Sequence, residues 1–170
     1  FVSPYEAWMY KYLKEVDPDA AHEDPEDPFM QVASRKGDIH EEKLFNDLRN
    51  EVDTSIVIVN SDPEDMFTAT KEAMRNGIDL IYQGALKDDT FFGRADFLFK
   101  VEGHSGFGNY CYEIWDAKLA NKSKPQYLLQ LCCYSELLSS FQENLTPSCV
   151  LVYGNSERER FNIGEYFIFY

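Results

Sequence analysis

The sequence predicts a mixed α/β (α+β) domain in which helices flank a central mixed sheet. Two observations lead to this prediction. The 170 residues are 44% hydrophobic and 15% aromatic, which is typical of a folded chain with a sizeable core. Helical patterns come first along the chain, then three strand-like runs, one more helix and two further strands. Segments of both kinds therefore pack into one core, with the strands forming a sheet between the helices.

Apolar residues at helical spacing predict four helices. Asp62 is an N-cap residue followed by proline, and Gly77 is suited to end the same helix. An acidic loop broken by prolines, residues 17–28, separates the first helix from the second. The predicted helices are residues 4–15, 35–52, 62–77 and 125–142.

Runs rich in β-branched and aromatic residues predict six strands. Residues 87–90 are typical of a hairpin turn, and a longer glycine-rich loop is expected at 102–109. The predicted strands are residues 55–59, 78–86, 91–101, 110–119, 148–154 and 160–170.

The chain is expected to form a single domain. Residues 1–36 would contribute a helix and the acidic loop, and residues 37–170 the core. The chain does not begin with Met and ends inside an apolar run, so we expect it to be a fragment of a longer protein.

The net charge of −14 argues against nonspecific nucleic-acid binding through a broad basic face. Residues 1–65 hold 17 Asp or Glu and 6 Lys or Arg, or −11, which leaves 13 acids and 10 bases, or −3, for the other 105 residues. A local basic groove therefore remains open in the second part. No apolar run reaches about 18 residues, so no membrane span is expected. The start of the chain lacks the charge order of a secretory signal, and we expect an intracellular protein, cytoplasmic or nucleoid-associated.

Asp116 and Lys118 lie two residues apart in a predicted strand, so their side chains face the same side of the sheet. Asp96, on the preceding strand, would lie beside Asp116 if the two strands are neighbours. Two adjacent carboxylates near a buried region are costly unless a cation joins them. A divalent metal ion would neutralise both. The alternative is a purely structural Asp–Lys ion pair.

Further motifs lie in a fixed order along the chain: "GDIHEE", "GRADF", "EIWDAK" and "QLCCY". In this order they resemble the RecB-type branch of the PD-(D/E)xK nuclease superfamily, over residues 37–134. The resemblance implies a restriction-endonuclease-like core with a metal-dependent active site. The positions that match the branch's motifs are His40, Asp96, Asp116, Lys118, Gln130 and Tyr134.

The resemblance also implies roles. His40, Asp96 and Asp116 would bind the metal ion, while Asp96, Asp116 and Lys118 would be catalytic. Two carboxylates with water suit Mg²⁺ or Mn²⁺, and an imidazole shifts the preference toward Mn²⁺. A core histidine is the alternative for His40.

Other residues are expected to support the site. Gln130 and Tyr134 share one helix face, which Gln126 extends by a turn.

Arg94, Lys122 and Lys124 are candidate phosphate contacts, with ordinary surface cations as the alternative. Glu113 has the opposite parity to Asp116, so we expect it on the other face, outside the metal site.

The expected activity is hydrolysis of DNA phosphodiester bonds, on single-stranded or end-bearing DNA, in repair, recombination or defence. Exonuclease and endonuclease action are both open. The alternatives are a catalytically silent DNA-binding or scaffold module, and RNA as substrate, because viral cap-snatching endonucleases use a related set of residues. The strong acidity suggests that a helicase or another domain delivers the strand.

Many members of this branch carry four cysteines that bind an iron–sulfur cluster. Here the cysteines lie at positions 111, 132, 133 and 149, without CxxC spacing, and two of them fall within a predicted helix. We expect buried, reduced thiols and no cluster within these residues.

Overall fold

The computed structural model describes residues 11–12, 15–16, 28–146 and 148–170. The chain divides into two compact units, Phe1–Lys36 and Gly37–Tyr170, and the sheet lies in the second. Most of the helix expected at 4–15 and of the acidic loop expected at 17–28 lies outside the described residues. Helix α2, Pro28–Leu48, begins earlier and ends sooner than the helix expected at 35–52.

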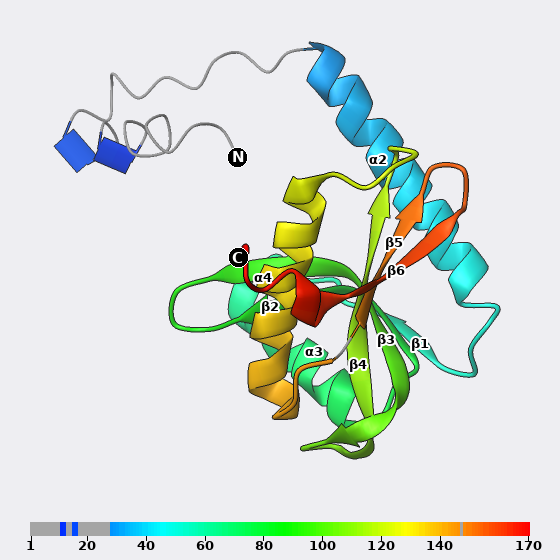
Figure 1. Ribbon diagram of the computed structural model, residues 1–170, viewed down its shortest axis with the longest axis vertical. Coiled ribbons are helices and arrows are strands. Elements are labelled where there is room, and N and C mark those ends of the chain that lie inside the picture. The colour runs from blue at the N-terminus through cyan, green and yellow to red at the C-terminus, as the bar shows by residue number, and fades with distance from the viewer. Residues whose placement is uncertain (1–10, 13–14, 17–27, 147) are drawn as a thin grey trace. The chain divides into compact units, whose positions relative to one another are not determined.

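Six strands form one mixed sheet in the order β1-β2-β3-β4-β5-β6 (Figure 1). Strands β2, β3 and β4 form an antiparallel meander, β1 runs parallel to β2, β5 runs parallel to β4, and β6 is antiparallel to β5. The predicted mixed sheet with flanking helices is therefore confirmed. The strands are β1 Ser55–Val57, β2 Leu80–Lys87, β3 Phe92–Ser105, β4 Gly108–Lys118, β5 Ser148–Tyr153 and β6 Arg158–Asn162.

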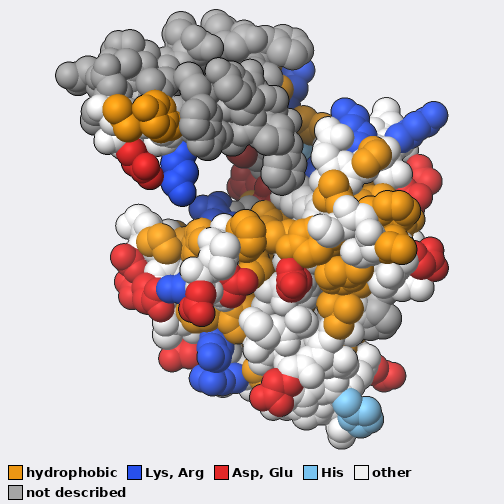
Figure 2. All heavy atoms as spheres, turned by 60° about the vertical axis from the view of Figure 1, so that its left-hand side comes forward, with side chains coloured by type: hydrophobic (Ala, Val, Ile, Leu, Met, Phe, Trp, Pro, Cys, Tyr) orange, Lys and Arg blue, Asp and Glu red, His pale blue; other side chains and the backbone are white. Residues whose placement is uncertain are grey.

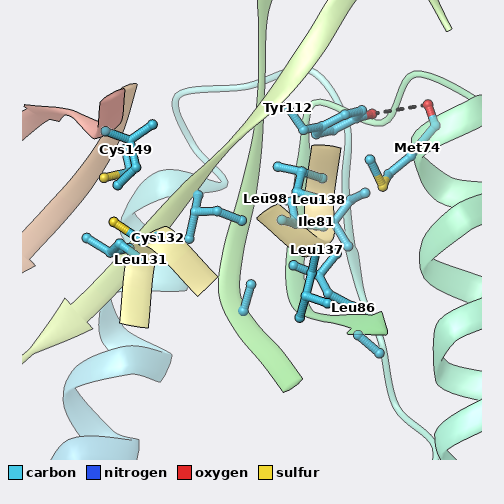
Figure 3. Close-up of a cluster of buried hydrophobic side chains, with 14 of the residues drawn as sticks. Met74, Ile81, Leu86, Leu98, Tyr112, Leu131, Cys132, Leu137, Leu138 and Cys149 are labelled. Atoms are coloured by element: carbon cyan, nitrogen blue, oxygen red, sulfur yellow. Dashed lines mark hydrogen bonds between the residues drawn. The ribbon is translucent and has the colours of Figure 1, made fainter. Parts of the chain in front are cut away.

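Helices α3 (Pro63–Arg75) and α4 (Pro125–Gln142) connect the two parallel strand pairs, β1–β2 and β4–β5. Strands β2 and β4 point the same way because both are antiparallel to β3. Both connections step in the same direction along the sheet, so right-handed crossovers place both helices on one face. The hydrophobic core between these two helices and the sheet includes Met74, Ile81, Leu98, Leu131 and Leu138 (Figure 3).

The C-terminal part of α2 covers the other face of the sheet. Leu44, Phe45 and Leu48 are buried there, and the Phe45 ring stacks on Tyr82 with 4.6 Å between ring centroids. Alternation along the strands divides the residues between the two faces: Phe97 packs with α2, and Leu98 packs in the other cluster. The sheet residues under α2 are Leu80, Phe97, Trp115, Val150 and Val152.

Helix α3 has the predicted N-cap, Asp62, whereas its C-cap residue is Asn76, one position before the predicted Gly77. The Asp62 carboxylate accepts hydrogen bonds from the backbone N–H groups of Glu64 (2.9 Å) and Asp65 (3.1 Å), and Pro63 occupies the first turn. Gly77, at φ +68°, follows the last residues of the helix in the left-handed conformation that glycine adopts without strain. None of the described helices combines the length and the apolar character of a membrane span.

Two further elements differ from the prediction. The segment at 160–170 is not one strand, because β6 ends at Asn162 and a 3₁₀ helix, Ile163–Glu165, follows. Ile163 is buried in the cluster under α4, and this burial turns the chain away from the sheet edge. The loop expected at 102–109 is also wrong, since β3 runs to Ser105 and β4 begins at Gly108.

Gln142 ties the end of α4 to β4. Its side chain is 0% exposed; Oε1 accepts from the backbone N–H of Tyr112 (2.8 Å), and Nε2 donates to the carbonyl of Tyr112 (3.2 Å) and to Thr146 Oγ1 (2.8 Å). Gln142→Ala would leave the buried N–H of Tyr112 without a partner and remove one of the two donors to the Tyr112 carbonyl, the other being Thr146 Oγ1. We expect a loss of about 3 kcal/mol of unfolding free energy in urea denaturation.

The matched control is Gln126→Ala at the exposed start of the same helix, which should change the unfolding free energy by less than about 0.5 kcal/mol. If both variants lost the same small amount, Gln142 would not be what fixes α4 to β4.

Candidate functional site

Asp96 and Asp116 meet where β3 and β4 run side by side. Phe97 of β3 pairs with Trp115 of β4. Asp96 directly precedes Phe97 and Asp116 directly follows Trp115, so in this antiparallel pair the two aspartates lie opposite each other. Asp96 Oδ2 accepts a hydrogen bond from the backbone N–H of Ala117 (2.7 Å). Lys118 Nζ lies 2.6 Å from Asp116 Oδ2, so Asp116 and Lys118 share one face, as their spacing predicts.

The Asp116 side chain is 1% exposed, and Lys118 is 20% exposed. Among the described residues, the Asp116 oxygens contact Lys118 and Asp96. A buried carboxylate costs several kcal/mol, of which one lysine offsets only a part. The buried Asp116 carboxylate therefore lowers the stability of the folded protein, and its position is suited to binding a cation.

The pKa values in this cluster reflect the crowding of negative charge. Burial raises the pKa of Asp96 well above its usual range, and the charges of Asp116 and Glu41 raise it further. Burial also raises the pKa of Asp116, against the opposing charge of Lys118. Burial alone would lower the pKa of Lys118, but Asp116 outweighs it and the pKa is raised, so the lysine stays an ammonium. A cation placed between the aspartates would favour ionisation of both.

Glu41 belongs to this cluster, although the sequence prediction left it out of the site. Gln83 Nε2 donates a hydrogen bond to Glu41 Oε1, which links α2 to β2. Burial raises the pKa of Glu41, hydrogen bonds with Gln83 and Tyr82 lower it, and the charge of Asp116 raises it again. Its place directly after His40 was the one signal in the sequence that pointed to it.

Gln83 is in a left-handed backbone conformation, φ +58°, in the middle of β2. The pairs on either side of it, Tyr82–Phe97 and Gly84–Ala95, keep a regular register, so Gln83 lies opposite Asp96. Tyr82 and Gln83 both reach residues of α2, whereas successive residues of a regular strand would point to opposite faces. Such a conformation costs a non-glycine residue about 1–3 kcal/mol and is typical of functional sites.

His40 lies on α2 and is half-buried. Its Nε2 atom is buried and has no hydrogen-bond partner among the described residues. The structure gives no hydrogen bond from this atom to Asp96 or Asp116. A buried ring nitrogen without a partner is what a metal ligand in its free state would present, and a core histidine would normally be hydrogen-bonded.

Gln130 and Tyr134 lie on α4, four residues apart, and Gln130 Nε2 donates to the Tyr134 hydroxyl (3.3 Å). Gly93 gives Tyr134 room on β3, because a Cβ added at Gly93 would be 2.6 Å from Tyr134 Cε1. Burial raises the pKa of Tyr134, and the charges of Asp96 and Asp116 add to this. Tyr134 therefore stands close to the aspartates, on the side of α4.

The basic residues expected to contact phosphates, Arg94 and Lys124 among them, differ in their surroundings. Arg94 Nε donates to Gln83 Oε1 (2.7 Å), which makes it a partner of Gln83. Lys124 Nζ lies 5.7 Å from the ring centroid of Tyr127, and Lys118 Nζ lies 5.3 Å from the same centroid.

Lys122 and Gln126 are exposed. They are not brought into the cluster and remain candidates only for contacts with a bound strand.

Glu113 is excluded from the site, as its parity predicts. The buried carboxylate accepts from Trp115 Nε1 (2.7 Å), Ser148 Oγ (2.8 Å) and Arg160 Nη2 (2.9 Å). These partners satisfy it, and its role is structural.

The cluster contains carboxylate and imidazole groups of the kind that bind a hard metal ion, but they are not arranged as a complete set of ligands. Within the described residues, no three His, Cys, Asp or Glu side chains come together as a ready-made set of metal ligands. The buried Asp116 carboxylate, next to Asp96, and the unpartnered Nε2 of His40 nevertheless fit a group that is bound there, because a buried polar atom such as this Nε2 is otherwise almost always satisfied. Carboxylate oxygens with one imidazole are donors that suit Mn²⁺ or Mg²⁺.

No protein-family model matches the chain. No curated protein sequence matches it significantly either.

Proposed function

We propose that this chain is a metal-dependent nuclease that hydrolyses DNA phosphodiester bonds, with Asp96, Asp116 and Lys118 as its catalytic residues. The observation that carries the proposal is Asp116: a carboxylate 1% exposed, whose contacts are with a lysine and a second buried carboxylate, Asp96. A purely structural Asp–Lys pair would not need Asp96 next to it, because the charge of Asp116 opposes the ionisation of this second buried carboxylate.

The roles follow from the contacts. Asp96 and Asp116 would hold Mn²⁺ or Mg²⁺, with His40 as the third ligand. A divalent ion bound there supplies Lewis-acid activation of the phosphodiester and of the attacking water. Lys118, kept charged by Asp116, offers its ammonium to the negative charge that builds up in the transition state. Tyr134, hydrogen-bonded to Gln130, lies close to the aspartates on the side of α4, where the two side chains would contact the bound strand.

We propose single-stranded or end-bearing DNA as the substrate, delivered by a helicase or another domain, in intracellular repair, recombination or defence. The net charge of −14 supports delivery by a partner, because a strongly acidic chain attracts free DNA poorly. On the described part of the face drawn in Figure 2, acidic side chains are interspersed with basic ones.

The test is a cleavage assay of the full chain with labelled single-stranded DNA, blunt duplex, closed circular DNA and RNA, in Mn²⁺, in Mg²⁺ and in EDTA. We expect metal-dependent cleavage of DNA that Asp116→Ala abolishes. The control is Glu102→Ala, an exposed carboxylate toward the other end of β3, which should cleave normally. Cleavage that survives Asp116→Ala would remove the site assignment, and cleavage of RNA alone would change the substrate.

A second candidate is a nuclease-like module that no longer cuts and serves to hold DNA or as a scaffold. The acidity of the chain and the lack of a closed ligand set among the described residues favour it. Binding of Mn²⁺ without cleavage of any of the four substrates would support this reading over the first.

A further inference from the structure

We propose that Glu41 is a further carboxylate ligand of the candidate metal site, and that Gln83 is the positioning residue that presents it. The inference rests on the proposed function, because it assigns two more residues to that same site. The carboxylates would then come from three elements: Glu41 from α2, Asp96 from β3 and Asp116 from β4.

The first argument is the direction of the Gln83 amide. Its oxygen accepts from Arg94, with 2.7 Å to Nε and a second contact to Nη2. The guanidinium group is only a donor, so it fixes which end of the amide is oxygen. The NH₂ end must therefore face Glu41 Oε1, to which it donates. Arg94 thus orients Gln83, and Gln83 holds one oxygen of Glu41; the Tyr82 hydroxyl also hydrogen-bonds this carboxylate.

The second argument is the backbone of Gln83. Its left-handed conformation, φ +58°, sits between two regular pairs of the ladder, directly opposite Asp96. A regular strand would send the side chain of residue 83 away from the face that Tyr82 occupies. The unusual conformation is what turns it toward α2, and glutamine is kept in a conformation that suits glycine better. A residue that only filled space there would not need this conformation.

The third argument is the place of Glu41 next to the two strands. Its partner Gln83 lies opposite Asp96 across β2 and β3, and Asp96 in turn lies opposite Asp116 across β3 and β4. Glu41 is thus one hydrogen bond away from the residue that faces Asp96. In contrast, the neighbouring Glu42 on α2 is exposed and offers a matched acid outside the site.

The test measures Mn²⁺ binding by the full chain with calorimetry and the electron paramagnetic resonance of free Mn²⁺. We expect Glu41→Gln to weaken binding at least about tenfold and Gln83→Gly to weaken it about tenfold, while Glu42→Gln binds like the wild type. Glycine suits φ +58°, so Gln83→Gly should keep or raise the melting temperature, which separates positioning from loss of the fold. In the double variant Glu41→Gln/Gln83→Gly, the second change should add nothing.

The outcomes separate the two proposals. If the wild type binds no Mn²⁺, the proposed metal site itself fails. If the wild type binds Mn²⁺ and Asp116→Asn does not, but Glu41→Gln binds as tightly as the wild type, Glu41 is not a ligand and this inference is overturned. Additive effects of the two changes in the double variant would show that Gln83 does not act through Glu41.

Discussion

Asp96→Asn is expected to reduce metal-dependent DNA cleavage at least about a hundredfold and, without metal, to make the protein more stable. Asparagine keeps an oxygen for the N–H of Ala117, which now bonds Asp96 Oδ2. It removes a charge whose ionisation is opposed by burial and by the charges of Asp116 and Glu41. At pH 8 we expect a gain of about 1 kcal/mol, or about 3 °C in melting temperature, measured in EDTA.

Asp89→Asn, in the exposed turn between β2 and β3, is the control and should leave both cleavage and stability unchanged. Added Mn²⁺ should raise the melting temperature of the wild type and not that of Asp96→Asn, because only the wild type binds the ion. If metal-free Asp96→Asn were less stable than the wild type, the surroundings of Asp96 would favour its ionised form, and the neighbouring charges of Asp116 and Glu41 would not destabilise it.

Lys118→Met should also lower cleavage by about a hundredfold, but with the opposite effect on stability. Methionine preserves most of the apolar length of lysine and removes the ammonium that lies 2.6 Å from Asp116 Oδ2. The buried carboxylate then keeps no cation partner, and we expect a loss of about 2 kcal/mol in metal-free urea denaturation at pH 8. The cost is limited because Asp116, whose pKa is already raised by burial, can take up a proton.

Lys43→Met, an exposed lysine on α2, serves as the control for the loss of one positive charge. Lys118→Arg should recover the stability, since it restores a cation beside Asp116, and thereby isolate the charge from the shape of the side chain. Equal stability of Lys118→Met and the wild type would show that Lys118 does not balance Asp116.

Local patterns predicted much of the fold. A period of two along β4 placed Asp116 with Lys118 and separated Glu113 from them, and the contacts of these residues agree. The ends of α3 were also readable, because Asp62 and Gly77 act through their own side chain or backbone preference. The prediction of a strand over residues 160–170 was wrong because the apolar residues there suit a strand. The chain turns at Ile163 because this side chain packs into the hydrophobic cluster under α4, which the local sequence does not show.

The part of the site that the sequence did not predict depends on contacts between distant segments. Glutamine has no preference for φ +58°, so the local sequence does not predict the left-handed conformation of Gln83. Its partner Glu41 is 42 positions earlier in the chain, and the pair exists only once α2 lies against β2. Whether His40, Asp96 and Asp116 bind a metal ion stays a prediction.

The outermost strand has a consequence for self-association. Strand β6 leaves one backbone edge open, and an open edge invites pairing with a second chain. Two of its side chains are arginines tied back into their own molecule, Arg158 to Glu51 and Arg160 to Glu113. Charged side chains along an edge strand disfavour docking of a second sheet, because the incoming strand has to accommodate them beside its own side chains. The two ion pairs therefore make this edge a poor template for self-association.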